Sequence, residues 1–360
     1  MSGDAEFPLT LEDLGEREIL TQVLRPRYRD TVGFGDDCAV LSQPPGDELG
    51  GELVATTDSC PTPLVTILGE RDLFYTGWLL AAINLSDLAA AGALPLGLVV
   101  NYTLPKQTTV DDFRRLLDGV DACAAAHGTQ VVGGDLRDGQ TMQLSATAVG
   151  RCVPGRRLGR TGATLGDRLL LVGSPGYLWA SALLSGGKAK LSEQDTQKIW
   201  SRARQPMAQV AAGRVLAESG LARAAMDVSD GLYATVRTLC EANGLGARMN
   251  TDIHLDSAIA EVCAQSGLSQ FELAETWGDW SLVVVVRAED VEAATTRLSA
   301  EAIPAREIGT LADAGEGLSL TVGGTSIPWR GIAQERFSTS SWHGGELSQL
   351  MADVLRVPAG

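Results

Sequence analysis

Five short segments of the sequence place aspartate beside glycine, serine, threonine or asparagine. They are Gly35-Asp36-Asp37, Thr56-Thr57-Asp58, Asn84-Leu85-Ser86-Asp87, Gly133-Gly134-Asp135 and Asp227-Val228-Ser229-Asp230-Gly231. Mg²⁺ prefers oxygen ligands, usually one or two carboxylates together with substrate phosphates and water. An aspartate at a strand end or helix start can point its carboxylate into a cleft. The five segments together therefore suit a site for hard cations.

Each segment also has an ordinary structural interpretation. Asp37 after glycine suits a solvated turn, and Asp227 or Ser229 suits a helix N-cap. Asn84 and Asp87 stand three residues apart, which puts them on one face of an otherwise apolar helix. A buried carboxylate there needs a partner. A metal ion or a structural hydrogen-bond cluster would each provide one.

Other nucleotide and metal motifs fit poorly. The segment Gly186-Gly187-Lys188-Ala189 resembles the end of a P-loop, but Ala182 and Ala189 stand where that motif has glycine and Ser/Thr. The pair Gly33-x-Gly35 lacks the third glycine of a dinucleotide-binding fold. No cysteine pair is spaced as CxxC, and the three histidines share no metal-like spacing, which argues against zinc.

The candidate residues need strands and helices to position them, and hydrophobic periodicity predicts such elements. The predicted strands are 53–57, 96–104, 130–132, 142–151, 168–173 and 281–286, and the predicted helices are 72–91, 110–127, a helix from Tyr177, 206–219, 232–243, 257–265 and 289–300. A turn-rich segment, 153–166, separates the two halves. This order predicts two α/β (α+β) domains of similar size.

Composition narrows the class of protein. The chain has 360 residues, enough for two domains, with 44% hydrophobic and 21% charged residues. Its net charge of −16 and lack of a basic stripe argue against nucleic-acid binding. The apolar stretch from Gly77 to Pro105 is interrupted by polar residues, so no membrane span is expected, and the N-terminus is no signal peptide. We expect a cytoplasmic protein.

Taken in order, the five aspartate segments resemble the thiamine-monophosphate kinase family of the AIR-synthase-like (PurM-like) superfamily. That family carries GDD-A-V, T-T-D, N-L-S-D-L-A-A-x-G-A, G-G-D and D-x-S-D-G-L elements, and this chain has each of them. The resemblance covers nearly the whole chain and extends to Gly15-Glu16 and the segment 156–163. It implies a homodimer in which N-terminal strands of two subunits form a barrel. The implied domains are 1–153, which binds ATP and Mg²⁺, and 154–345, followed by a tail at 346–360.

The resemblance also implies roles for individual residues. Magnesium would be held by Asp37, Thr56, Thr57, Asp58, Asp87, Asp135, Asp227 and Asp230, of which Asp58, Asp87 and Asp230 are the catalytic candidates. ATP would lie along Tyr102, Gly134, Asp135, Arg156 and Ser229. Phosphoryl transfer depends mainly on positioning and cations, so no general base is assigned.

The sequence departs from the family where the phosphoryl acceptor would bind. Val65 stands in place of a family histidine, Gly278 in place of the glutamate that precedes Asp279 and Trp280, and Ile332 in place of a C-terminal aromatic residue. Loss of polar contacts weakens recognition of a polar partner. We therefore expect an ATP- and Mg²⁺-dependent kinase whose small-molecule acceptor differs from thiamine monophosphate.

Three alternatives remain open. The chain could be a true thiamine-monophosphate kinase that makes thiamine diphosphate, with a tryptophan compensating in the pocket. It could be an AIR-synthase-like ligase or cyclase of a specialised pathway, which would release free phosphate. It could be a non-catalytic nucleotide-binding subunit, against which the costly set of aspartates argues.

Overall fold

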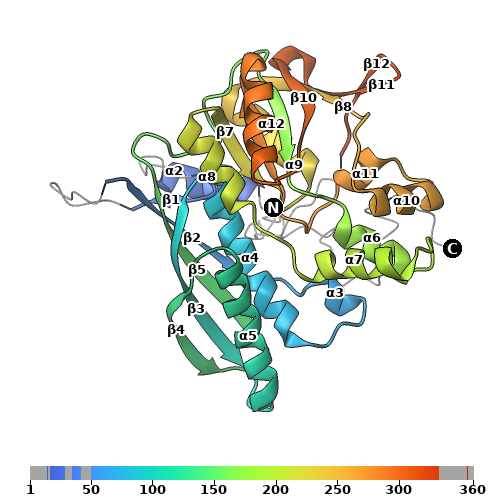
Figure 1. Cartoon of the computed structure of the whole chain (residues 1–360). Coiled ribbons are helices and arrows are strands. Elements are labelled where there is room, and N and C mark those ends of the chain that lie inside the picture. The colour runs from blue at the N-terminus through green and yellow to red at the C-terminus, as the bar shows by residue number, and fades with distance from the viewer. Residues whose placement is uncertain (1–13, 15–16, 29–34, 42–49, 332–354, 356–360) are drawn as a thin grey trace, which may run out of the picture.

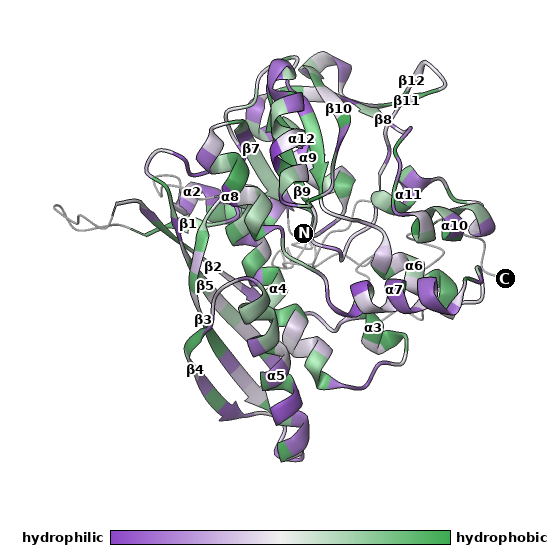
Figure 2. Cartoon of the chain, viewed as in Figure 1, coloured by the Kyte–Doolittle hydropathy of each residue, from purple (hydrophilic) through white to green (hydrophobic). Residues whose placement is uncertain are grey.

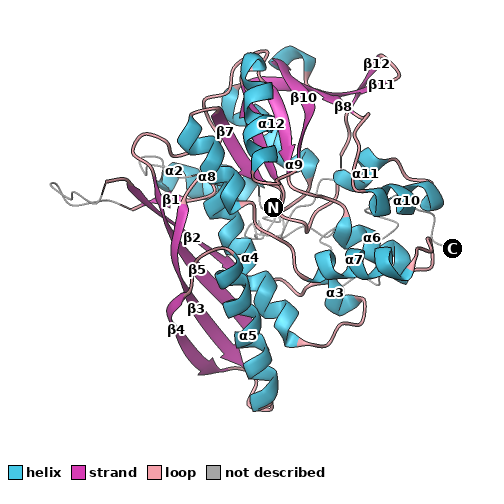
Figure 3. Cartoon of the chain, viewed as in Figure 1, coloured by secondary structure: helices cyan, strands magenta, loops and turns pink. Residues whose placement is uncertain are grey.

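The computed structural model describes residues 14, 17–28, 35–41, 50–331 and 355, and these residues form two sheets with helices around them (Figures 1 and 3). The first sheet has the order β1-β2-β5-β3-β4. Its strands are β1 (Ala39–Val40), β2 (Glu52–Ser59), β5 (Gln143–Cys152), β3 (Leu94–Leu104) and β4 (Val131–Asp138). Within it β3 and β4 are parallel, and the other neighbours are antiparallel.

Two long helices cover one face of this sheet. They are α4 (Leu73–Ala90) and α5 (Val110–Ala126). Their backbones approach closely at two glycines, since a Cβ on Gly119 would lie 1.9 Å from the carbonyl oxygen of Phe74, and one on Gly77 would lie 2.0 Å from that of Leu116. α4 is buried on nearly all sides, whereas α5 shows long hydrophilic stretches toward its outer end (Figure 2).

The second sheet has the order β12-β11-β8-β10-β6-β9-β7. Its strands are β6 (Arg168–Val172), β7 (Ala222–Asp227), β8 (Leu245–Asn250), β9 (Leu282–Val286), β10 (Ala305–Asp313), β11 (Leu318–Val322) and β12 (Thr325–Pro328). Alternation along β6 places Leu170 and Val172 in one hydrophobic cluster with α8 (Val210–Ser219) and α12 (Val291–Ala300). Leu169 and Leu171 enter another cluster with α9 (Leu232–Asn243). Helices therefore cover both faces.

A third hydrophobic cluster surrounds Trp179 beside the second sheet. It is built from α3 (Leu64–Ile67), α6 (Tyr177–Ser185), α7 (Glu193–Arg204), α10 (Ser257–Ser266) and the adjoining α11 (Gln270–Ala274). α3 comes from the first half of the chain and packs against α6 from the second (Figure 1). The short elements η1 (Ile19–Leu24), α2 (Arg25–Tyr28), η2 (Ala288–Asp290) and η3 (Ala314–Glu316) complete the described secondary structure.

Most predicted elements are confirmed, with shifted ends. The predicted helix 232–243 coincides with α9, and the predicted strand 96–104 begins earlier, as β3. The predicted strand 130–132 is longer in the structure, because β4 continues through Gly133-Gly134-Asp135 and pairs with β3. Sheet pairing here overrides the poor strand propensity of glycine. The sequence patterns did not predict the elements η1, α2, β1, α3, α7, β7, β8, α11, β10, η3, β11 and β12.

Among the described residues, α4 has the length and hydropathy of a membrane span. Its apolar window is 78% buried inside the protein, as expected of a core helix. Membrane insertion is therefore not indicated by α4.

Candidate active site

Three aspartates from distant parts of the chain converge between the two sheets. Asp37 lies just before β1, Asp87 lies in the last turn of α4, and Asp227 ends β7. One carboxylate oxygen from each lies within 4.8 Å of the others. We call Asp37, Asp87 and Asp227 the acidic cluster.

Neighbouring polar side chains hold the acidic cluster in place. The hydroxyl of Thr56 donates to Asp87 Oδ2 at 2.5 Å, and that of Ser86 donates to Asp227 Oδ2 at 2.8 Å. Asn84, fully buried on α4, accepts a hydrogen bond from the backbone N–H of Asp58 at 3.0 Å. The sequence left open whether a metal ion or a structural hydrogen-bond cluster accompanies the buried carboxylate. The hydrogen-bond cluster is present, and it surrounds the carboxylates.

Burial raises the pKa of each carboxyl in the acidic cluster, and repulsion from nearby carboxylates adds to it. Burial is the main cause for Asp87, whose pKa is well above its usual value, and the charges of Asp227 and Asp58 add to it. Burial and the charge of Asp37 raise the pKa of Asp227 to about 8. Burial also raises the pKa of Asp37, although Arg160 opposes the effect. The arrangement disfavours three negative charges unless a cation joins them.

Two arginines stand beside the cluster. Arg160 Nη2 donates to Asp37 Oδ1 at 2.6 Å, and Arg157 Nη1 donates to Asp36 Oδ2 at 2.9 Å. Asp36 also accepts the backbone N–H of Arg160 at 2.9 Å, which fixes this turn. Sequence reasoning missed Arg160, because the spacing did not distinguish it from its neighbouring arginines.

The residues fit a hard divalent cation. Carboxylate and hydroxyl oxygens are the ligands that Mg²⁺ selects. The cluster is shielded from water, since the side chain of Asp37 is 5% exposed and Asp227 as a whole residue is 3% exposed. A bound cation would therefore relieve repulsion between carboxylates that water does not screen. Asp87, Asp227 and Asp37 are the residues that would hold it.

Other candidates lie farther away on the first sheet. Thr57 is exposed on the sheet face opposite α4 and receives a hydrogen bond from Thr147. Asp135 lies on the same open face, in a row that runs through Asn101 and Ser145 to Ser59. Asp135 and Ser59 are therefore three strand spacings apart, which corresponds to about 14 Å. Within one chain, therefore, Gly134 and Asp135 do not join the acidic cluster.

Two further nucleotide candidates also lie apart from the cluster. Arg156 is exposed, and its guanidinium stands next to Gly220. Tyr102 is buried under α5 with its ring against Phe113 at 5.5 Å, and burial raises the pKa of its hydroxyl to about 12. Neither side chain reaches the carboxylates in a single subunit.

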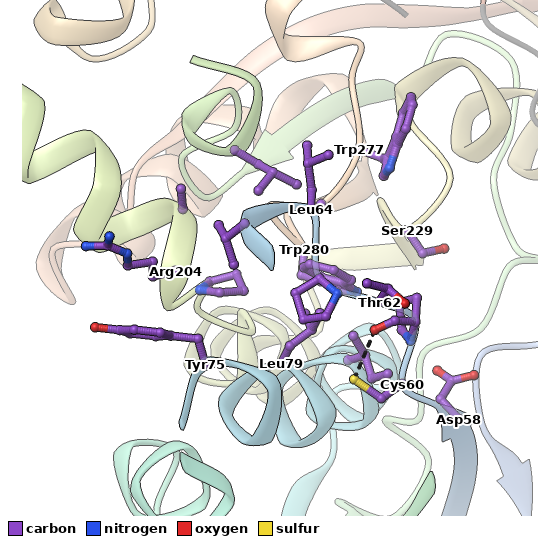
Figure 4. A pocket seen from close by; sticks show the side chains of 18 of the residues that line it. Asp58, Cys60, Thr62, Leu64, Tyr75, Leu79, Arg204, Ser229, Trp277 and Trp280 are labelled. Carbon is purple, nitrogen blue, oxygen red and sulfur yellow. Dashed lines mark hydrogen bonds between the residues drawn. The ribbon is translucent and has the colours of Figure 1, made fainter. Parts of the chain in front are cut away.

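A cavity of about 330 Å³ opens beside the carboxylates, and Asp58, Ser229 and Asp230 line it. Figure 4 shows Asp58 and Ser229 toward one end of this pocket and Tyr75 and Arg204 at the other, with Leu79 and Trp280 between them. The pocket thus has a polar end that adjoins the candidate cation site and a largely apolar interior.

Some of the residues predicted to contact the acceptor line the pocket, and Asp279 supports the loop that forms it. Val65, Gly278 and Trp280 line it. Asp279 does not line it, and its partly buried carboxylate accepts backbone N–H groups of Gly176 at 2.7 Å and Leu178 at 3.1 Å. Burial nevertheless raises the pKa of Asp279 to about 7. Ile332, like Gly15 and Glu16, lies outside the described residues.

Known proteins resemble this chain in sequence and structure. The families described as AIR synthase related protein, N-terminal domain, and AIR synthase related protein, C-terminal domain, match residues 35–152 and 164–321. The thiamine-monophosphate kinase of Salmonella typhimurium is 32% identical over 260 residues, covering 68% of this chain and 76% of the relative. That of Methanospirillum hungatei is 28% identical over 88% of this chain and 98% of its own length.

Solved structures agree with the sequence comparison. The thiamine-monophosphate kinase of Stenotrophomonas maltophilia is 28% identical with a TM-score of 0.68, covering 86% of this chain and 96% of that one. A structure described as AaThiL complexed with AMPPCP and TMP has a TM-score of 0.74 at 24% identity, covering 90% and 98%. The two-domain AIR-synthase-like fold is thereby confirmed. The chain belongs to the thiamine-monophosphate kinase family.

Proposed function

We propose that this protein is an ATP- and Mg²⁺-dependent kinase that transfers the γ-phosphoryl group to thiamine monophosphate. The observation that carries the proposal is the acidic cluster, which adjoins the polar end of the pocket that Asp58 and Asp230 line. The relatives named thiamine-monophosphate kinase support the reaction class, and the structural neighbour complexed with AMPPCP and TMP supports the two ligands. This acceptor replaces the different one that the sequence departures favoured.

The chain's own residues position the reactants. Asp37, Asp87 and Asp227, together with Asp58 and Asp230 at the pocket edge, would hold magnesium, which when bound neutralises phosphate charge. Thr56 and Ser86 keep two of the carboxylates oriented by donating hydrogen bonds to them. Arg160 adds a positive charge beside Asp37.

The acceptor would lie in the pocket with its phosphate toward Asp58 and Asp230 and its rings in the apolar interior. In that orientation, the acceptor phosphate oxygen attacks the γ-phosphorus of ATP, the bond from the β–γ bridging oxygen to that phosphorus breaks, and ADP leaves with the electron pair. Positioning and cations provide most of the catalysis in such a transfer. A general base is not needed, because the attacking phosphate oxygen is already ionised.

A turnover assay with ATP, Mg²⁺ and thiamine monophosphate tests the proposal, with ADP and thiamine diphosphate both measured. Equal amounts of the two products are expected. Release of free phosphate instead of thiamine diphosphate would favour the ligase-type alternative. ATP binding without turnover would favour a nucleotide-binding subunit.

A second candidate acceptor is favoured by one observation. Val65 and Gly278 give the pocket no charged contact at the two positions where the family has histidine and glutamate. Another phosphate monoester with a ring would then be the better substrate. Higher kcat/KM for such a compound than for thiamine monophosphate would support this candidate.

We further propose that the protein works as a homodimer joined through the open face of the first sheet. Exposed apolar side chains at Leu94, Leu96 and Val99 support an interface on this sheet. Asp135 and Gly134 lie on the same sheet and would reach a site only if a partner subunit covered it. Val99→Lys is expected to give a monomer in light scattering with much reduced turnover, and a dimeric variant would contradict the interface.

A further inference from the structure

The pocket interior has one wall made of four residues that carry no charge. Leu178, Trp277, Gly278 and Trp280 line it, and we call them the aromatic wall. Trp280 packs against Leu79 and the neighbouring Ile83 of α4. The charged pocket residues lie elsewhere, with Asp58 at one end and Arg204 at the other (Figure 4). Arg204 is itself paired with Glu70 at 2.8 Å.

Trp280 is held in an unusual backbone conformation. Its φ of 46° lies in the left-handed region, which is strained for a bulky residue. The preceding Asp279 anchors the turn, since its carboxylate accepts two backbone N–H groups at the start of α6. The fold therefore maintains strain that directs an indole into the pocket.

Leu178 and Gly278 fit together and set the shape of the wall. A Cβ on Gly278 would lie 2.1 Å from Leu178 Cδ2, and the φ of Gly278 is 98°. Leu178 thus occupies the space that a side chain at position 278 would need. Trp277 is fixed in turn, because its carbonyl oxygen accepts the indole N–H of Trp179 at 3.0 Å.

We propose that the aromatic wall determines acceptor specificity by binding a planar aromatic ring through apolar contacts alone, with Leu178 limiting the size of that ring. This inference rests on the proposed function, in which the acceptor phosphate lies at the polar end. An indole face favours a flat partner. An enclosed apolar pocket discriminates by size, typically 10–200-fold for a methylene-sized change.

Binding to the full-length protein with Mg²⁺ and a non-hydrolysable ATP analogue tests the inference without requiring turnover. The probes are phenyl phosphate, cyclohexyl phosphate, which has a similar size but is not planar, and 2-naphthyl phosphate. The wild type should bind phenyl phosphate at least roughly 5-fold more tightly than cyclohexyl phosphate. Trp280→Ala should abolish that preference while leaving affinity for the ATP analogue unchanged.

In Leu178→Ala, the affinity for 2-naphthyl phosphate divided by the affinity for phenyl phosphate should rise by about 10-fold, because the larger ring gains space. Leu183→Ala is the matched control, because Leu183 lies on the same helix and in the same hydrophobic cluster but is not among the lining residues. Equal binding of phenyl and cyclohexyl phosphate by the wild type, or an unchanged ratio in Leu178→Ala, would overturn the inference. Ring-selective binding by a protein that lacks kinase turnover would instead contradict the proposed function.

Discussion

The acidic cluster and the aromatic wall serve the same cavity but are stabilised in opposite ways. Burial raises the pKa values of Asp37, Asp87 and Asp227, and repulsion from neighbouring carboxylates adds to the effect. The wall consists of apolar side chains and a strained backbone around Trp280. The first region is costly without a cation, whereas the second keeps its shape through packing and the Asp279 anchor.

This difference suggests a division of labour. The cluster consists of aspartates, which can be recognised in the sequence as candidate cation ligands, and the cations that they suit are common to phosphoryl transfer. The wall uses Leu178 and Gly278, which carry no reactive group, and acts through shape. Changes to the cluster should therefore remove catalysis, while changes to the wall should alter which acceptor is used.

The largest effect is expected from removing a carboxylate of the acidic cluster or of the adjoining pocket edge. Asp87→Asn and Asp58→Asn should each lower kcat by about 10³-fold or more, because magnesium would lose a charged ligand. Thermal stability without magnesium should not fall for Asp87→Asn, since burial and repulsion disfavour that charge. Asp111→Asn, an exposed change on α5, is the control. Near-normal turnover in both Asp87→Asn and Asp58→Asn would break the assignment.

Magnesium itself should distinguish the two regions. If the cluster binds Mg²⁺, the ion should raise the unfolding free energy by about 2.7 kcal/mol at one hundred times its Kd. Thermal shift measurements should show this gain in wild type and Leu178→Ala, but much less in Asp87→Asn. A magnesium effect that survives unchanged in Asp87→Asn would mean that the ion binds elsewhere.

A third prediction concerns Asp279, which anchors the wall. The folded-state pKa of Asp279 is raised to about 7 from an ordinary 3.8, so between these values the native state binds more protons than the unfolded state. Its contribution to stability is therefore present at low pH and is lost as pH rises from about 4 to 7, by up to roughly 1 kcal/mol per pH unit. Asp279→Asn does not titrate.

Chemical unfolding of both proteins at several pH values measures this difference. Stability of the wild type should decline relative to Asp279→Asn across that window and then stay level above pH 7. A difference that is independent of pH would mean that Asp279 is ionised in both states. The anchor would then act by its hydrogen bonds to Gly176 and Leu178 alone.

The sequence by itself determined the chemistry and much of the architecture. Asn84 and Asp87 could be placed on one helix face because helical periodicity is local. The order of the five aspartate segments indicated the family, and alternation of strands and helices indicated two α/β domains. Strand β8 was not predicted, since it pairs with β10 and β11, which follow it by about sixty residues or more. The hairpin of β11 and β12 was also missed, although its two strands are joined by the local turn Gly323-Gly324.

Tertiary structure alone decided which candidates meet. Asp37, Asp87 and Asp227 converge although 140 residues separate Asp87 from Asp227 in the sequence, whereas Asp135 lies on an open sheet face. Arg160 stands at the cluster and Arg156 does not. The fit of Leu178 against Gly278 likewise depends on packing between α6 and a loop about one hundred residues later. Residue type and spacing report local geometry, but long-range contacts arise only when the chain folds.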